Sequence, residues 1–385
     1  MENEIQVEKI VKKSPLDQVD EVLEHLQKKD KRMVVAMAPS VRVALGEGFG
    51  GKIGQNVEGK IITAFRMLGF DDVFDVNFGA DLTIVEEANE FVNRFLSGQK
   101  LPMFTSCCPA WVKFVEQNYP QFINNLSTCK SPQQMLSGMI KTYYAQKINV
   151  KASEIYFVSV MPCIAKKMER QRPHQSSTPF GLDTDAVITA REMIDIIKSK
   201  NINLLDLEDG KFDALLGNSS GSGVIFGTTG GVMEASLRTL SEELSGKKID
   251  KVEYLLVRGL GGIKHAEINV GEKKVKVAVA SGLLNAKQLL EQISKGEVYY
   301  DFVEVMACEG GCSNGTGMPM HFKTAEENKK VAMQRAKGLY KSDASKVSRK
   351  SHENPAVKQI YKEFLGEVGG DKAKEILHTK YIQSK

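Results

Sequence analysis

The chain has 385 residues, of which 42% are hydrophobic and 26% charged, proportions that are ordinary for a globular protein with a large core. Its 52 Lys and Arg residues nearly balance its 48 Asp and Glu residues, which argues against a nucleic-acid-binding protein. No uncharged run is long and apolar enough to span a membrane, and no apolar signal-peptide core follows Met1. We therefore expect a cytoplasmic protein in a reducing compartment.

Strand-like apolar runs alternate with helical patterns along the chain, which predicts an α/β fold with mainly parallel sheets flanked by helices. In chain order we expect a strand at 33–37, a helix from 41–45, a strand at 73–76, a turn at 79–81 and a helix at 82–95, a strand at 103–105, a helix at 111–117, strands at 155–160 and 186–189, a helix at 191–198, strands at 252–260 and 275–279, a helix at 286–294 and a strand at 299–305.

Composition divides the chain into three expected segments. Residues 1–31 form a charged, helix-prone extension that we expect to dock loosely. Residues 32–320 hold all the predicted strands and form the main domain, expected as two lobes with a site buried between them. Residues 321–385 are helical and carry 15 Lys and Arg against 8 Asp and Glu. Such a basic stretch is most often a solvated face, but it could also receive an acidic partner.

Most of the cysteines follow predicted strands. Five of the six lie just beyond the strands at 103–105, 155–160 and 299–305, namely Cys107, Cys108, Cys163, Cys308 and Cys312. Sites in open parallel sheets form at the carboxyl ends of the strands, so we expect these cysteines to share one site.

The spacing of the cysteines bears on the metal that they could bind. Cys308 and Cys312 are separated by a Gly-Gly turn, so both thiolates can reach one metal centre. Zinc sites usually contain C-x-x-C or histidine pairs, and the sequence has neither near these cysteines. Thiolates from three strand ends favour an iron–sulfur cluster, while zinc and inert packing of small buried side chains remain open alternatives.

Three cysteine segments carry a family resemblance. They read T-S-C-C-P at 105–109, M-P-C at 161–163 and E-V-M-A-C-E-G-G-C at 304–312. In this order they resemble the three signature motifs of the iron-iron (FeFe) hydrogenases. The similarity runs from about Met33 to Tyr381 and includes M-A-P-S-V-R at 37–42, K-S-P-Q-Q at 130–134 and I-F-G at 225–227.

The resemblance implies a cofactor and its ligands. In the family, cysteines matching Cys108, Cys163, Cys308 and Cys312 hold a 4Fe–4S cluster. The cysteine matching Cys312 also bridges to a di-iron subcluster that carries CO, cyanide and an azadithiolate. Together these groups form the H-cluster, which maturation proteins complete by delivering the di-iron unit.

The resemblance also implies which residues surround the cofactor. Lys166, Ser40 and the backbone near Pro39 match the family's donors to cyanide, and Met161 and Met306 match its soft apolar walls. Gln133 and Phe226, in two further matching motifs, complete the expected cofactor-binding set.

A proton relay is implied as well. The matching residues are Cys107, Glu87, Ser127 and Glu90. Glu87 and Glu90 lie three residues apart on a predicted helix and share a face, although a solvated helix would show the same spacing.

The function implied is reversible reduction of protons to H2, with ferredoxin or a similar one-electron carrier and without nucleic acid or membrane partners. Residues 32–320 then match the family's large subunit and residues 321–385 its small subunit. Cysteine-rich ferredoxin-like modules, which many relatives carry before this domain, are absent from the sequence.

Two alternatives within the same resemblance stay open. An iron–sulfur assembly protein of the hydrogenase-like eukaryotic branch typically lacks the cysteine that matches Cys107 and carries extra N-terminal cysteines, whereas this sequence keeps Cys107 and has no cysteine before it. A redox-sensing hydrogenase usually has a sensor domain, and none follows Lys385.

The sequence departs from the family pattern at four positions. Thr316 and Met318 stand where the family usually has G-G-G-Q-P, Ala110 stands where glycine is common, and Cys129 adds a thiol near Ser127. None of the four is an expected cluster ligand or relay residue.

Overall fold

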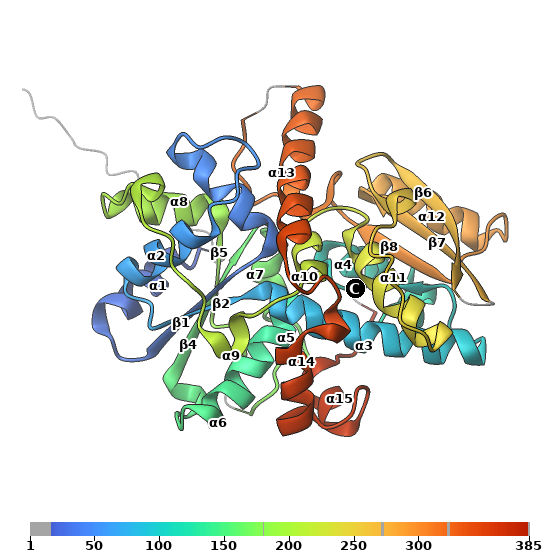
Figure 1. Cartoon of the computed structure of the whole chain (residues 1–385), viewed down its shortest axis with the longest axis horizontal. Helices are drawn as coiled ribbons and strands as arrows, with labels where there is room; N and C mark the ends of the chain where they lie inside the picture. Colours follow the sequence, from blue (N-terminus) through green and yellow to red (C-terminus); the bar gives the residue numbers. More distant parts are fainter. Residues whose placement is uncertain (1–16, 180, 271–272, 322–323, 384–385) are drawn as a thin grey trace, which may run out of the picture.

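The computed structural model describes residues 17–179, 181–270, 273–321 and 324–383 (Figure 1). Within these ranges, no helix combines the length and the apolar character that crossing a membrane requires.

The described strands form two separate sheets, one in each lobe. Sheet A has the order β2 (Asp72–Asp75), β1 (Arg32–Met37), β4 (Ile155–Met161) and β5 (Ala186–Thr189), and all its strand pairs are parallel. Sheet B has the order β3 (Met103–Phe104), β8 (Phe302–Met306), β7 (Lys273–Ser281) and β6 (Ile263–Val270), and only its β6–β7 pair is antiparallel. The predicted α/β class and the two mainly parallel sheets are confirmed.

Helices cover both sheets and fill the space between the lobes (Figure 1). Their bounds are α1 (Val19–Lys28), α2 (Glu58–Leu68), α3 (Val76–Ser97), α4 (Pro109–Asn118), α5 (Pro132–Met139), α6 (Ala145–Lys147), α7 (Ala165–Glu169), α8 (Ala190–Ser199), α9 (Ala214–Gly217), α10 (Gly221–Ile225), α11 (Gly231–Ser245), α12 (Leu283–Ser294), α13 (Ala325–Ser345), α14 (Pro355–Ile360) and α15 (Asp371–Leu377). Every residue of β4 is buried, as expected for a parallel strand covered on both faces.

Helix α3 is longer than the sequence pattern predicts. It begins directly after β2, with Asp75 as its N-cap accepting a hydrogen bond from the Asn77 amide, so the predicted turn at 79–81 is wrong. Gly79 lies inside the helix, where a Cβ would stand 2.1 Å from the Pro132 carbonyl oxygen. Gly79 is therefore needed for close packing of α3 on α5. In the sequence alone, a glycine with this role cannot be told from a glycine in a turn.

The strand predicted at 252–260 is wrong. The segment is irregular apart from one short 3₁₀ turn at Leu255–Val257, and the side chains of Leu255 and Leu256 are both 66% exposed. The edge strand of sheet B is instead β6, whose polar residues gave no apolar signal. Because β6 is an exposed edge, apolar side chains alternate with exposed polar ones over residues 265–270, so the strand lacks the continuous apolar run of the inner strands.

The helix predicted from 41–45 is two 3₁₀ helices, η1 (Pro39–Val43) and η2 (Leu45–Phe49). The tight turns bury Arg42 completely, and its guanidinium donates to the Pro39 carbonyl at 3.0 Å and to Asp75 at 2.6 Å. This ion pair fixes the backbone immediately after β1.

Helix α1, near the start of the described chain, and helix α13 both pack on the main body. Val22 and Leu26 of α1 are buried in the core of the sheet A lobe. Helix α13 runs between the lobes (Figure 1), and its Arg335 forms a buried ion pair with Glu47 of η2 at 2.6 Å. Farther along α13, Asp343 accepts from Arg238 of α11 at 2.9 Å. The helix thus contacts both lobes through buried charge pairs.

Candidate metal centre

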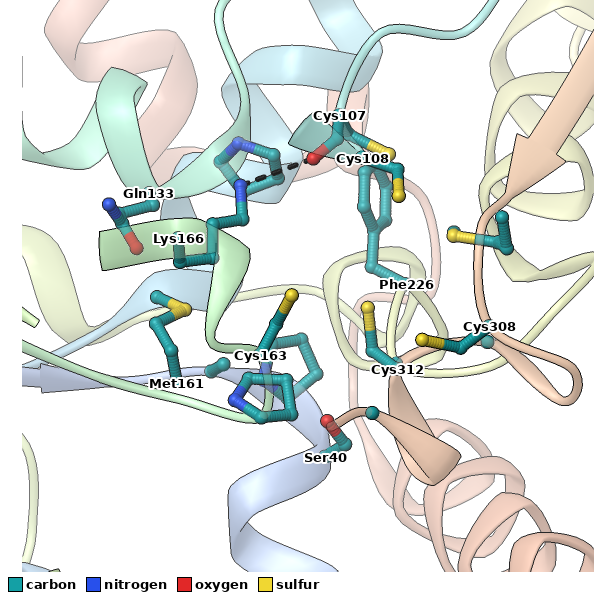
Figure 2. Close-up of a pocket in the computed structure, with 18 of the residues that line it drawn as sticks. Ser40, Cys107, Cys108, Gln133, Met161, Cys163, Lys166, Phe226, Cys308 and Cys312 are labelled. Atoms are coloured by element: carbon teal, nitrogen blue, oxygen red, sulfur yellow. Dashed lines mark hydrogen bonds between the residues drawn. The ribbon is translucent and has the colours of Figure 1, made fainter. Parts of the chain in front are cut away.

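A cavity lies where the carboxyl ends of strands from both sheets meet. Its empty volume is about 710 Å³, and its lining is almost entirely apolar apart from cysteines and a few polar groups (Figure 2). Every residue expected to bind metal or cofactor lines it: Cys108, Cys163, Cys308, Cys312, Lys166, Ser40, Pro39, Met161, Met306, Gln133 and Phe226. Cys107 also lines the cavity.

The cysteines reach the cavity from different strand ends. Cys107 and Cys108 follow β3, Cys163 follows β4, and Cys308 and Cys312 follow β8. Their sulfur atoms point toward a common space in Figure 2. The structure therefore brings together five residues that the sequence spreads over about two hundred positions.

In the absence of a cation, the environment of these cysteines disfavours the ionised thiolate form. Burial raises the pKa of Cys163, Cys308 and Cys312, that of Cys308 to about 12, and the neighbouring cysteines add to the effect. Thiolates held this close repel one another unless a cation lies between them. A buried, sulfur-rich set of this kind fits an iron–sulfur cluster.

A buried ammonium group lies beside the thiols. Lys166 Nζ donates to the Cys107 carbonyl oxygen at 3.1 Å, drawn dashed in Figure 2, and to Glu169 Oε2 at 2.7 Å. Burial by itself would lower the pKa of Lys166, but the charge and hydrogen bond of Glu169 and the nearby thiols raise it. Ser131 Oγ also donates to Glu169 Oε2, at 3.0 Å, so the lysine is held charged at the cavity wall.

Several polar atoms at the cavity have no partner within the described chain. The Ser40 hydroxyl and both amide atoms of Gln133 are buried there without a hydrogen bond. Leaving a buried polar group unpaired costs about 1–3 kcal/mol, so these atoms indicate that polar groups of a bound ligand complete the site. The apolar walls of Met161, Met306 and Phe226 would enclose that ligand.

Glu87 lies near Cys107, behind the cavity wall. Burial raises the pKa of Glu87 to about 8, and the charges of Glu90 and Glu304 contribute, whereas Ser127 opposes the shift. Burial and the Glu87 carboxyl together hold the pKa of Cys107 well above its usual value. Both groups therefore carry protons at neutral pH, and Glu87 Oε2 has no hydrogen-bond partner within the described chain.

Glu90 lies one turn farther along α3, where the described structure opens to solvent. Its Oε2 accepts from Ser127 Oγ at 2.9 Å, and its Oε1 accepts from Arg94 at 2.6 Å. Glu90 lines a second cavity, of about 1320 Å³, between α3 and the C-terminal segment. Cys107, Glu87, Ser127 and Glu90 thus lie in sequence from the first cavity toward the surface.

Glu86, which precedes Glu87 on α3, has a different environment from Glu90. It is fully buried and bonded by the C-terminal segment, with Tyr361 Oη, the Gly369 amide and His378 as its partners. Its role is to fix that segment against α3.

The residues that hold the expected site residues in place were not predicted from the sequence. Glu169 holds Lys166, and Arg94 holds Glu90, with spacings of three and four residues that are ordinary for helix pairs. Thr316, a departure from the family pattern, accepts a hydrogen bond from the Ile164 amide at 3.2 Å, directly after Cys163. Met318 is buried in the core of the sheet A lobe.

Two family models match the chain. "Iron only hydrogenase large subunit, C-terminal domain" matches residues 31–316, and "Iron hydrogenase small subunit" matches residues 329–384.

Curated relatives give the same result. The chain is 46% identical to the NADP-reducing hydrogenase subunit HndD of Solidesulfovibrio fructosivorans and 45% identical to iron hydrogenase 1 of Clostridium pasteurianum, over 94% of its own length in each case. It spans only 62% and 63% of those two relatives. A cytosolic iron–sulfur assembly factor of Xenopus tropicalis is less similar, at 31% identity over 91% of this chain and 74% of that protein.

Solved structures agree with the sequence comparisons. A variant of the [FeFe]-hydrogenase HydA1 from Chlamydomonas reinhardtii superposes with a TM-score of 0.84 and 38% identity, over 95% of this chain and 99% of that one. The cysteine cavity, the sequence matches and the shared fold together show that the chain belongs to the iron-only, or [FeFe], hydrogenase family.

Proposed function

We propose that this chain catalyses the reversible reduction of protons to H2 with a one-electron carrier. The observation that carries the proposal is the cavity in which four cysteines from both lobes meet a fifth cysteine, a buried lysine and unpaired polar atoms. The similarity to hydrogenases over nearly the whole chain supports the same function.

The residues fit the H-cluster. Cys108, Cys163, Cys308 and Cys312 would hold a 4Fe–4S cluster, with Cys312 shared with a di-iron subcluster carrying CO, cyanide and an azadithiolate. When bound, this group supplies the electron transfer and the H2 chemistry that the side chains lack. Thiolate ligands suit iron, and metal binding overcomes the burial that raises the thiol pKa values.

Lys166, Ser40 and Gln133 would orient that group. Lys166 has three N–H donors, and its contacts with Cys107 and Glu169 use two of them. The third, with the unpaired Ser40 hydroxyl and Gln133 amide, can bond to anionic or polar ligands of the irons. Pro39, Met161, Met306 and Phe226 exclude water from the same space.

Cys107 would carry the proton between the cavity and the protein interior. After the thiol gives up its proton on the cavity side, the protonated Glu87 carboxyl can replace it, because its pKa of about 8 keeps a proton available near neutral pH. Ser127 and Glu90 then connect Glu87 to the second cavity and to solvent.

Electrons would arrive from ferredoxin or a similar carrier, and dedicated maturation proteins would deliver the di-iron unit. We assign the catalytic domain to residues 32–320 and a small-subunit-type segment to residues 321–385. Its excess of basic side chains suits an acidic carrier. A reducing cytoplasm would keep the described cysteines as free thiols.

The test combines infrared spectroscopy with an H2 assay on protein that has been loaded with iron and sulfide and then maturated. CO and cyanide stretching bands together with H2 evolution support the proposal. A loaded 4Fe–4S cluster without those bands and without H2, after a maturation that activates a known hydrogenase in parallel, would favour an iron–sulfur assembly protein instead.

A further inference from the structure

We propose that Glu90, Cys129 and His378 form a zinc-binding site, separate from the cysteine cavity, at the solvent end of the proton path. The binding part of this inference stands on geometry alone. Its effect on turnover rests on the proposed function.

The three side chains converge from different parts of the chain. One ligand atom from each residue lies within 4.8 Å of the other two, and Cys129 Sγ is 3.8 Å from Glu90 Oε2. Glu90 lies on α3, Cys129 lies in the segment before α5, and His378 directly follows α15. Zinc bonds of about 2.0–2.3 Å require the three atoms to draw together by about 1 Å.

The backbone holds two of the ligands side by side. Cys129 and His378 face each other in an isolated antiparallel bridge. Two hydrogen bonds of 2.8 Å flank the bridge, from the Lys130 amide to the Leu377 carbonyl and from the Thr379 amide to the Thr128 carbonyl. In such a pair the side chains project from the same face and lie close together.

A buried carboxylate orients the histidine. His378 Nε2 is 3.0 Å from Oε2 of the fully buried Glu86; the carboxylate accepts a hydrogen bond from Nε2–H, which leaves the lone pair on Nδ1. Nδ1 lies 2.8 Å from Thr128 Oγ1, whose hydroxyl can turn aside. A carboxylate behind the non-coordinating nitrogen is the usual arrangement for a histidine that binds zinc.

The donor set and its access both suit zinc. A thiolate, an imidazole and a carboxylate are the three protein ligands that zinc takes, and a fourth position can be filled by water. Glu90 and His378 line the open cavity of about 1320 Å³, so an ion can enter from solvent. Binding involves no electron transfer, and the Cys129 proton leaves to solvent when the sulfur binds.

The site competes with the proton path for one atom. Glu90 Oε2, the oxygen nearest Cys129, also accepts the hydrogen bond from Ser127. Zinc bound there would occupy the lone pair that a proton must use on its way to solvent. We therefore infer that zinc inhibits H2 turnover reversibly and that a chelator restores it.

The decisive experiment measures zinc bound to protein whose 4Fe–4S cluster has already been loaded, so that the cavity cysteines are occupied. Zinc K-edge X-ray absorption should show one sulfur at about 2.3 Å and two or three nitrogen or oxygen neighbours at about 2.0–2.1 Å. Cys129→Ser should remove the sulfur neighbour, and both Cys129→Ser and His378→Gln should lower zinc affinity at least tenfold.

His174→Asn is the matched control, because His174 lines the same cavity and belongs to no three-ligand group among the described residues. It should bind zinc as the wild type does. Zinc surrounded by four sulfurs, or affinity unchanged in both Cys129→Ser and His378→Gln, would overturn the site. Zinc binding as described in a protein without hydrogenase activity would leave the site standing and defeat only the proposed function.

Discussion

At the residue scale, two adjacent cysteines have different surroundings. Cys108 occupies the position just before α4 and lies near the thiols of Cys163, Cys308 and Cys312, whose pKa values it helps to raise. Cys107 lies near two of these thiols as well, but it also has Glu87 beside it, and burial followed by the Glu87 carboxyl raises its pKa. Identical side chains one residue apart therefore face the proposed metal site and the proposed proton path.

This difference predicts opposite defects for two alanine variants. Cys108→Ala should lose the 4Fe–4S cluster, because one of its four ligands is gone. Cys107→Ala should keep its iron and its CO and cyanide bands but lose about 10²–10⁴-fold in turnover, the usual contribution of a positioned acid or base. Iron content, infrared spectra and H2 assays measure the three quantities.

Partial recovery in Cys107→Asp, with less in Cys107→Ser, would support the proton role, since only aspartate restores a readily titratable group. Iron loss from Cys107→Ala with retention in Cys108→Ala would mean that the two roles are exchanged.

Glu87 predicts a pH dependence of stability. Its carboxyl has a pKa of about 8 when folded, against 4.5 for an unperturbed glutamate. Between these pH values the folded chain keeps a proton that the unfolded chain releases. Because the folded state binds more protons, the free energy of unfolding falls as the pH rises, by up to about 1.4 kcal/mol per pH unit.

Glu87→Gln cannot titrate and should lose this component. Urea unfolding of both proteins, matched in iron content, should show the variant gaining stability relative to the wild type from pH 5 to pH 8. Parallel pH profiles would show that Glu87 ionises normally in the folded chain.

At the scale of elements, α3 connects the two cavities. It carries Glu86, Glu87 and Glu90, and it packs on α5, which carries Gln133 at the cysteine cavity. The contact between α3 and α5 depends on the missing side chain of Gly79. A shift of α3 would therefore move the proposed proton path and the cavity wall together.

Gly79→Ala tests this contact. The added Cβ would meet the Pro132 carbonyl oxygen at 2.1 Å, so we expect a loss of about 1–3 kcal/mol in the free energy of unfolding, as for other overpacked sites. Gly261→Ala is the control, because nothing lies within 4 Å of a Cβ there. Equal unfolding midpoints for the two variants would show that α3 can move away from α5 at little cost.

The sequence predicted the buried elements better than the exposed ones. The strands β1, β4 and β8 are apolar runs that pair only with parallel neighbours and are buried on both faces, and β7 is apolar and buried over its second half. The edge strand β6 was missed because exposed polar residues interrupt its apolar ones. The start of α3 was misplaced because a glycine required by packing resembles one required by a turn.

For the site, every residue that the motif resemblance assigned to the cofactor lies on the wall of one cavity. The pairings that hold those residues were not predicted, since Arg94 and Glu169 resemble ordinary surface charges in a sequence. The contact of His378 with Glu86 joins positions 292 residues apart, a distance at which no local pattern carries information.

At the scale of the whole molecule, α13 joins the lobes by buried charges. Arg335 pairs with Glu47 beside sheet A, and its guanidinium also donates to the carbonyl oxygens of Ser313, at 3.0 Å, and Pro319, at 2.8 Å. Ser313 directly follows Cys312, so the helix supports the loop that carries a predicted iron ligand.

Arg335→Met should therefore lower both stability and iron retention. Removing one partner of a buried ion pair costs about 3–5 kcal/mol because the other charge stays buried. Lys330→Met, on the same helix, breaks an exposed pair with Glu326 and should change the unfolding free energy by less than about 1 kcal/mol. Chemical denaturation and iron release to a chelator measure the two effects. Similar behaviour of the two variants would show that α13 is not held by its buried charges.

The division of the four cysteines between the lobes has a consequence for assembly. Cys163 follows β4 of sheet A, whereas Cys108, Cys308 and Cys312 follow β3 and β8 of sheet B. A cluster bound to all four would join the two lobes, and because the four thiolates come together only in the folded chain, its binding would stabilise the folded state. Docking of the lobes and ligation of iron then form one linked equilibrium, in which each step increases the yield of the other. Opening the lobes would then require the rupture of an iron–sulfur bond, so we expect the cluster-loaded chain to resist unfolding more than the iron-free chain.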